Sequence, residues 1–158
     1  MVRALADADL PWAEALVEEF FGSRMQARCG ELVDVVGRPG FVAERDGERV
    51  GLLTYRRHED GVELATIIAR DERRGIGSEL VDALVREVAG RDRIWLVTSN
   101  DNLDALRFYQ RRGFRLAALR PGAIDEARQA LKPEISETGA YGIRIRDELE
   151  LELPPELP

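Results

Sequence analysis

The stretch that decides the fold reads Ile67-Ile68-Ala69-Arg70-Asp71-Glu72-Arg73-Arg74-Gly75-Ile76-Gly77-Ser78. An apolar run typical of a strand leads through a basic turn with two glycines into a segment whose apolar residues recur at helical spacing. Glycine lets the backbone N–H groups of a turn approach a ligand closely, and a helix N-terminus adds about half a positive charge. The turn therefore predicts a site that binds phosphate oxygens.

Two common nucleotide-binding motifs do not fit this turn. Leu80 stands where the dinucleotide fingerprint G-x-G-x-x-G has its third glycine, and the Gly-Lys-Ser/Thr of the P-loop is missing. A nucleotide-binding protein is therefore a weaker interpretation. Arg70, Arg73 and Arg74 raise the local positive charge in an otherwise acidic chain.

Hydrophobic periodicity and turn residues predict the elements on both sides of the turn. Before it we expect a strand over 1–5, a helix that starts at Asp9 and Pro11 and ends at Gly22, and antiparallel strands over 41–45, 49–57 and 62–69. The weakly patterned segment 24–40 is expected to be a loop. After it we expect a helix over 78–88, a strand over 93–98, a helix over 103–112, a strand over 114–119, a helix over 123–131 and a strand over 148–153.

Composition limits the classes of protein to which the chain can belong. Its 158 residues, 44% of them hydrophobic, can bury one good core, so we expect a single domain over 1–158. A net charge of -7 repels phosphate backbones and argues against a nucleic-acid partner. Without a secretory signal or an apolar run of roughly 20 residues, we expect a cytoplasmic protein with no membrane contact. The lone Cys29 and a single histidine argue against disulfide, redox and zinc chemistry.

A second block of sequence points to a particular family. It reads Asn100-Asp101-Asn102-Leu103-Asp104-Ala105-Leu106-Arg107-Phe108-Tyr109-Gln110-Arg111-Arg112-Gly113-Phe114. This block resembles the Asn-x-x-Ala-x-x-Phe-Tyr-x-x-x-Gly-Phe segment of the GNAT superfamily of acyltransferases. The turn over 72–77 is similar to that family's pyrophosphate loop, Gln/Arg-x-x-Gly-x-Gly/Ala, with Glu72 as a departure that leaves the backbone contacts intact. The resemblance covers 5–119.

The resemblance implies a fold and a co-substrate. The fold class is α/β (α+β), a GNAT-type acyl-CoA N-acyltransferase fold with a twisted mixed sheet and helices on both faces. The fourth and fifth strands, 62–69 and 93–98, would diverge and hold acetyl-CoA in the gap, with no metal required. The implied cofactor-binding residues are Ala65, Thr66 and Ile67 for the pantetheine arm, Arg73, Arg74, Gly75, Ile76, Gly77 and Ser78 for the pyrophosphate, and Asn102 near the reactive end.

Two residues are the candidates for proton transfer. By the resemblance, Tyr109 protonates the departing thiolate; the alternative is a buried helix tyrosine with a satisfied hydroxyl. A base or a proton-conducting water must neutralise the amine, and Glu63 is the candidate because it is in phase with Ala65 and Ile67 on one strand. Its alternative is a solvated charge at the start of a strand. His58 is expected to be merely exposed, and Asn102 is also a good helix N-cap.

The predicted function is the transfer of an acetyl group to a primary amine, on either a small molecule or a peptide. The rival interpretation is a non-catalytic acyl-CoA-binding sensor or scaffold of the same fold. The link over 120–146 is longer than usual between the last two strands, and we expect it to line the acceptor side of the site, with a flexible stretch at Gly139–Gly142. The alternative is that it covers a sheet edge or forms a contact in a homodimer.

Overall fold

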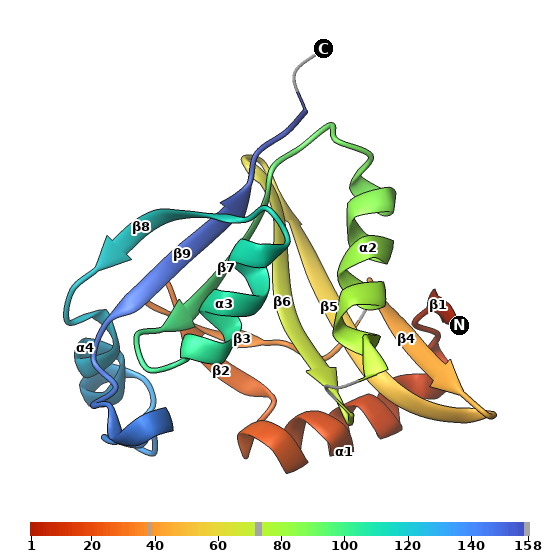
Figure 1. Ribbon diagram of the computed structural model, residues 1–158. Coiled ribbons are helices and arrows are strands. Elements are labelled where there is room, and N and C mark those ends of the chain that lie inside the picture. The colour runs from red at the N-terminus through yellow and green to blue at the C-terminus, as the bar shows by residue number, and fades with distance from the viewer. Residues whose placement is uncertain (38, 72–73, 157–158) are drawn as a thin grey trace. The chain divides into compact units, whose positions relative to one another are not determined.

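A computed structural model of the chain describes residues 1–37, 39–71 and 74–156 (Figure 1). Over these residues the protein has four α-helices and a mostly antiparallel set of strands, which confirms the predicted mixed α/β fold class. The residues group into two compact units. Unit 1 holds Met1–Arg24, Asp34–Ile94 and the tail from Pro155, and unit 2 holds Met25–Val33 and Trp95–Pro154. The single domain over 1–158 stays a prediction.

Unit 1 contains strands in the order β1-β4-β5-β6, each antiparallel to its neighbour, together with two α-helices. The predicted N-terminal helix, hairpin and third strand are thereby confirmed. The hairpin turns at Asp46-Gly47, where both residues have the positive φ that a two-residue turn between twisted strands requires. The elements are β1 Val2–Ala4, η1 Asp7–Asp9, α1 Leu10–Phe21, β4 Gly40–Arg45, β5 Glu48–His58, β6 Gly61–Ala69 and α2 Ile76–Val88.

The core of unit 1 fixes the start of α2 against the sheet. Leu80 and Leu84 of α2 have no exposed surface, and each such burial contributes about 2 kcal/mol. A side chain at Gly51 of β5 would place its Cβ 2.6 Å from the Cγ2 of Ile76, so only glycine lets the first helical residue pack this closely. Ile76, the buried first residue of α2, thus anchors the turn that precedes this helix.

A β-bulge interrupts the pairing of β5 with β6 and corrects one prediction. Thr54 pairs with Thr66 and Tyr55 with Leu64, so Ala65 is an extra residue on β6. Residues that pair across two neighbouring strands have their side chains on the same face of the sheet. Glu63 therefore lies on the same face as Thr66 and not on the face of Ile67. The parity argument that placed Glu63 on the face of Ile67 was wrong because a bulge shifts the alternation by one residue.

Unit 2 has strands in the order β7-β9-β8 and a separate hairpin of β2 and β3. The helices and strands predicted after residue 94 are confirmed, with ends that move by one or two residues. The elements are β2 Met25–Arg28, β3 Glu31–Asp34, β7 Ile94–Ser99, α3 Leu103–Arg111, β8 Arg115–Arg120, α4 Ala123–Ala130, η3 Ala140–Gly142 and β9 Glu148–Leu153, with the first residue of β7 and the last of β3 assigned to unit 1.

The hairpin of β2 and β3 was not predicted, since 24–40 was expected to be a loop. Its turn is formed by Cys29 and Gly30, both with positive φ (50° and 78°). A cysteine in this conformation carries no sequence signal for a hairpin, because glycine, asparagine and aspartate are the residues that favour it. The backbone N–H of Cys29 donates to Oε2 of Glu148, 3.1 Å away, and this bond joins the hairpin tip to β9.

Candidate functional site

The turn between β6 and α2 has the backbone expected of a phosphate site. Gly75 is the N-cap of α2 in a left-handed conformation (φ 71°, ψ 13°), and a Cβ added to it would meet nothing within 4 Å. Glycine cannot cap the helix with a side chain, so the N–H groups at the start of α2 are left for solvent or a ligand. An anion at this end is also stabilised by the helix dipole.

The arginines around this turn contribute unequally to its positive charge. Arg74 is exposed, and its Nε lies 3.7 Å from Oδ2 of Asp71. Such a solvated ion pair contributes little to stability. Arg70, in contrast, donates to both carboxylate oxygens of Glu19 at 3.1 and 2.8 Å, which lowers its contribution to the local positive charge. The predicted pyrophosphate residue Arg73 lies outside the described residues, as does Glu72.

Asn102 begins α3 in unit 2 as its N-cap. The Oδ1 of Asn102 accepts from the backbone N–H of Ala105 at 3.3 Å, and its Nδ2 donates to Oγ1 of Thr98 at 3.1 Å. The capping interpretation is therefore confirmed. Asn102 is exposed, and contact with a cofactor stays a prediction that capping does not oppose.

Tyr109 lies buried on α3 between two aromatic rings. Its ring meets Phe108 and Phe114 edge to face, with centroids 5.0 and 5.3 Å away. Burial raises the pKa of the Tyr109 hydroxyl well above its usual value, and the positive charge of Arg28 offsets only part of this rise. The phenol therefore keeps its proton throughout the neutral range, as a proton donor must.

Glu63 forms a buried charged contact that the sequence did not indicate. Its side chain is only 1% exposed, and its Oε2 lies 2.8 Å from Nε2 of His58 and 3.5 Å from Nη1 of Arg56. The alternative of a solvated charge at a strand start was wrong for Glu63. The prediction that His58 is merely exposed was also incomplete, because its 31% exposed ring connects the buried carboxylate with the surface. The catalytic role of Glu63 stays a prediction.

The junction between β7 and α3 holds the long link of unit 2 in place. The Nδ2 of Asn100 donates to the carbonyl of Arg144 at 2.8 Å, and its Oδ1 accepts from the N–H groups of Arg146 and Asp147 at 3.0 Å each. Two carboxylates add to this anchor. Asp101 accepts from the N–H of Ala140 at 2.9 Å, and Asp104 accepts from the Tyr141 hydroxyl at 2.6 Å.

This anchor corrects one expectation. A side chain at Gly139 would place its Cβ 2.0 Å from Oδ2 of Asp101, so the glycine allows close packing rather than flexibility. The segment Gly139–Gly142, expected to be flexible, is instead fixed to the residues on either side of Asn102. Sequence reasoning used Asn100 and Asp101 only as part of a motif and missed their role as anchors.

A comparison with known families decides which protein class this is. The sequence model described as the Acetyltransferase (GNAT) family matches residues 5–114, well over half of the chain. The chain belongs to the GNAT acetyltransferase family. A relative from Bacillus subtilis (strain 168), the uncharacterized protein YdhI, is 40% identical over 125 residues, which cover 77% of this chain and 74% of that protein.

Solved structures agree with the GNAT assignment at the level of the fold. The ribosomal-protein-S18-alanine N-acetyltransferase from Escherichia coli has a TM-score of 0.69 and 20% identity, over 100% of this chain and 95% of that one. A Bacillus subtilis acetyltransferase in complex with CoA has a TM-score of 0.66 and 21% identity, over 97% of both chains. The fold that the two motifs implied is confirmed.

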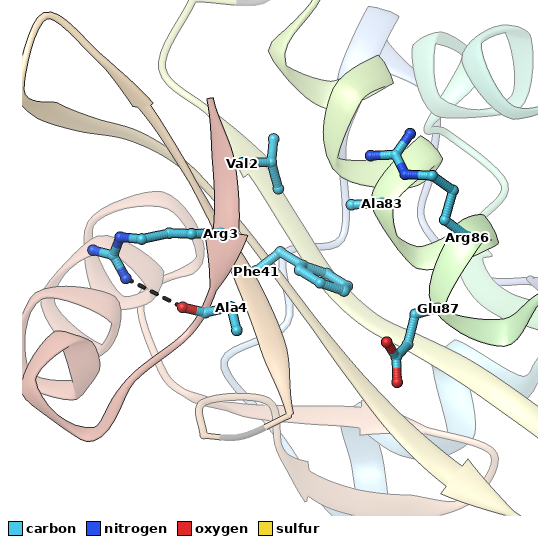
Figure 2. Close-up of a pocket in the computed structure, with 7 residues that line it drawn as sticks. All are labelled: Val2, Arg3, Ala4, Phe41, Ala83, Arg86 and Glu87. Carbon is cyan, nitrogen blue, oxygen red and sulfur yellow. Dashed lines mark hydrogen bonds between the residues drawn. The ribbon is translucent and has the colours of Figure 1, made fainter.

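Unit 1 of this GNAT member also has a hollow away from the turn between β6 and α2 (Figure 2). Its volume is about 290 Å³, and its helical side belongs to the second half of α2, roughly 10 Å or more along the axis from Ile76. The Arg3 guanidinium is bound to Asp9, and the polar ends of Arg86 and Glu87 are exposed. Two of its three charged side chains are thus already in ion pairs, Arg3 with Asp9 and Glu87 with Arg57. It is lined by Val2, Arg3, Ala4, Phe41, Ala83, Arg86 and Glu87.

Two further properties concern only the described residues. Among them, no group of three or more His, Cys, Asp or Glu side chains is placed to hold a metal ion. Within the same ranges, no helix is both long and apolar enough to cross a membrane. A metal-free reaction and a cytoplasmic location stay predictions for this GNAT member.

Proposed function

We propose that the protein is an N-acetyltransferase that transfers an acetyl group from acetyl-CoA to a primary amine by direct attack in a ternary complex. The observation that carries the proposal is the start of α2. Gly75 holds a left-handed backbone in open space and leaves the first N–H groups of the helix to an anionic ligand. In a member of the GNAT family, the pyrophosphate of coenzyme A is the ligand that fits this turn.

The residues around the turn divide the binding of the co-substrate. Acetyl-CoA supplies the thioester that an amine can attack. The N–H groups at Gly75–Ser78, with the charges of Arg73 and Arg74, bind the pyrophosphate. The backbone of Ala65–Ile67 pairs with the pantetheine arm as an added strand does, and Asn102 contacts the reactive end. The bulge at Ala65 supports this placement, because bulges are frequent beside active sites.

Two side chains then move one proton each. Glu63 takes the proton that the attacking nitrogen must lose, directly or through a water, and His58 gives that carboxylate a route to solvent. Tyr109 gives a proton to the departing sulfur, so the proton lost by the amine is balanced by the one gained by the thiolate. A backbone N–H of β6 polarises the carbonyl oxygen as negative charge develops on it.

The acceptor class follows from charge and from the anchored link. A net charge of -7 favours the approach of cationic amines at low ionic strength. Within the segment Gly139–Gly142, Ala140 and Tyr141 donate to Asp101 and Asp104. These two carboxylates lie on either side of Asn102, the residue assigned to the reactive end of acetyl-CoA. We therefore assign the link to the acceptor side, for a small-molecule or peptide amine.

The deciding experiment measures both binding and thiol release. Purified protein is titrated with acetyl-CoA and then assayed for free thiol with small amines, peptides with free N-termini and peptides with lysine. Amine-dependent thiol release supports the proposal. Tight acetyl-CoA binding without turnover across the whole panel would instead indicate a non-catalytic acyl-CoA module. Equal stabilisation by ATP in the absence of acetyl-CoA would indicate a nucleotide-binding protein.

A further inference from the structure

One buried hydroxyl of β6 in unit 1 lacks a hydrogen-bond partner. Thr66 is only 7% exposed, and its hydroxyl is bonded to none of the residues that the structure describes. Its oxygen is not one of the fully enclosed unpartnered atoms found among those residues, so it borders accessible space. Buried polar groups are normally paired, and an exception calls for an explanation. Only the backbone of Thr66 is assigned to the pantetheine arm, which leaves its side chain for another role.

Thr54, directly opposite on β5, differs from Thr66 in this respect. The two threonines pair across β5 and β6, so their side chains lie on the same face of the sheet. The Thr54 hydroxyl donates to the carbonyl of Val35 at 2.6 Å. Of two identical side chains on one face, one therefore holds the segment that precedes β4, and the other keeps its hydroxyl for a ligand.

The Thr66 hydroxyl projects from the same face as the carboxylate of Glu63. Glu63 pairs with Arg56, which is two residues from Thr54 on β5, so all four side chains share this face. Without the bulge at Ala65, Glu63 and Thr66 would project to opposite faces, because residues three apart do so in a regular strand. Two residues of a strand span about 7 Å. This separation leaves room for one nitrogen atom that contacts both side chains.

We infer that the Thr66 hydroxyl holds the acceptor, by accepting a hydrogen bond from the same nitrogen that gives its proton to Glu63. The inference rests on the proposed acetyl transfer. A neutral primary amine has two N–H hydrogens. One passes to Glu63 as the C–N bond forms and the C–S bond breaks, and the departing sulfur takes its proton from Tyr109. The other stays on the amide product, and this retained hydrogen is the one that Thr66 binds.

This contact makes the site selective for primary amines. A threonine hydroxyl has two lone pairs that can accept such a hydrogen bond. An N-methylated acceptor has a single N–H hydrogen in its neutral form, and Glu63 removes it, so none is left for Thr66. A site that hydrogen-bonds a group of its substrate discriminates against the analogue that lacks this group, because its own buried polar atom then stays unpaired.

The kinetic test removes the hydroxyl and keeps the shape of the side chain. It uses the full chain, the amine that gives the fastest thiol release and the N-methyl derivative of that amine. Thr66→Val should lower kcat/KM for the primary amine by about tenfold, with acetyl-CoA affinity unchanged. The rate with the N-methyl derivative should change little, so the ratio of the two kcat/KM values should also fall by about tenfold. Thr66→Ser retains the hydroxyl and should restore the ratio.

Stability in the absence of any substrate gives a second readout. Thr66→Val removes a buried hydroxyl that has no partner among the described residues, so the Tm of the unliganded chain should equal or exceed that of the wild type. Thr54→Val is the matched control, because it leaves the carbonyl of Val35 without its bond. This control should lower Tm and leave the ratio of primary to N-methylated amine as in the wild type.

Three results would overturn the inference while the proposed acetyl transfer stands. The first is an unchanged ratio of primary to N-methylated amine in Thr66→Val, with an active wild type. The second is a Thr66→Ser variant no better than Thr66→Val, which would assign the effect to shape. The third is a Tm that falls in Thr66→Val as far as in Thr54→Val, since the hydroxyl would then have a structural partner. A wild type that releases no thiol with any amine would instead overturn the proposed function, and this inference with it.

Discussion

The Nε2 atom of His58 lies 2.8 Å from Oε2 of Glu63, where the last residue of β5 meets the third residue of β6. The carboxylate is buried and the imidazole is partly exposed. A buried base is useful only if its proton can return to solvent after each turnover, and an imidazole in contact with it provides such a path. The pair therefore gives the proposed base of the reaction a physical exit for its proton.

Replacement of Glu63 by Gln tests this base directly. Glutamine keeps the shape of the side chain and removes its ability to accept a proton, so turnover should fall by about 10²-fold or more. The affinity for acetyl-CoA, measured by titration, should stay near that of the wild type. His58→Gln is the matched control and should lower turnover by a smaller factor, since water can replace a proton path but not the base. Wild-type turnover in Glu63→Gln would remove Glu63 from the mechanism.

Tyr109→Phe separates the hydroxyl of Tyr109 from its packing. The ring is retained between Phe108 and Phe114, so acetyl-CoA affinity should change little while turnover falls by about 10²-fold. Because burial raises the pKa of Tyr109, the wild type should lose no activity to tyrosine ionisation up to about pH 9. A pH–rate profile measures this. Equal turnover of the two proteins would argue against the proton donor.

The same raised pKa has a consequence for stability in alkali. A folded-state pKa above the unfolded value means that the folded chain holds its proton longer as the pH rises. The raised pKa of Tyr109 contributes to the free energy of unfolding below about pH 10, and this contribution is lost as the pH rises toward the folded-state pKa. The free energy of unfolding of Tyr109→Phe should therefore decline less than that of the wild type above about pH 10, as chemical denaturation can measure.

Gly75→Val tests the phosphate turn against a matched glycine. Gly75 and Gly22 have similar left-handed backbones (φ 71° and 79°), and neither would place a Cβ within 4 Å of another atom. Valine at either position should cost about 1–2 kcal/mol of stability through backbone strain. Only Gly75→Val should weaken acetyl-CoA binding, which thermal shift against ligand concentration can measure. Equal affinity in both variants would contradict the assignment of the turn.

The buried Asp9 predicts how unit 1 responds to acid. Its carboxylate accepts from both terminal nitrogens of Arg3, at 2.7 and 2.9 Å, and from the N–H of Ala6. The Arg3 guanidinium holds the pKa of Asp9 well below its usual range. A lowered folded-state pKa gives stability that is present above about pH 4 and is lost as the pH falls further.

Asp9→Asn should therefore lower the free energy of unfolding by about 3 kcal/mol at neutral pH, with a difference from the wild type that narrows below about pH 4. Asp34→Asn is the control, because the Arg24–Asp34 pair is exposed and should contribute less than about 1 kcal/mol. Equal losses in the two variants, measured by urea denaturation, would contradict the role of burial.

Much of the fold could be predicted from local pattern. Three local patterns each indicate a single structure, and the residues around each pattern favour that same structure. They are the apolar stripe of α1, the turn at Asp46-Gly47 and the helical spacing of Leu80 and Leu84. The strict alternation of glutamate and leucine over 148–153 likewise predicted which side chains of β9 share a face of the sheet. In the candidate site, Asn102 as a cap followed from its place ahead of an apolar periodic segment.

What could not be predicted depends on contacts distant in sequence or on irregular backbone. The bulge at Ala65 shifts the face of Glu63 by one residue, and no residue type in β6 marks it. The turn at Cys29 uses a residue that disfavours positive φ and is tied to Glu148, 119 residues later. The contact between Glu63 and His58 likewise depends on how the strands are paired, which a hairpin pattern alone does not determine.

The last prediction concerns the link that Asn100 holds. Asn100→Ala removes the side-chain bonds to Arg144, Arg146 and Asp147 and leaves the Asn102 cap in place, while the backbone N–H of residue 100 still donates to the carbonyl of Asp147. If the link lines the acceptor side, the loosened segment should raise the acceptor KM several-fold with acetyl-CoA affinity unchanged, since the groups assigned to acetyl-CoA are untouched. Tyr141→Phe removes only the bond to Asp104 and should also raise the acceptor KM, by a smaller factor.

A shortened link gives the stronger version of the same test. Replacing 120–146 with a tight turn should raise the acceptor KM further if the segment shapes the acceptor site. If it merely covers an edge or joins two subunits, stability or association should fall while the acceptor KM stays constant. Leu116→Lys with Leu119→Lys is the surface control, because it changes two exposed side chains of β8 and leaves the link intact. An acceptor KM that moves in the link variants and not in this control would assign the segment to substrate recognition.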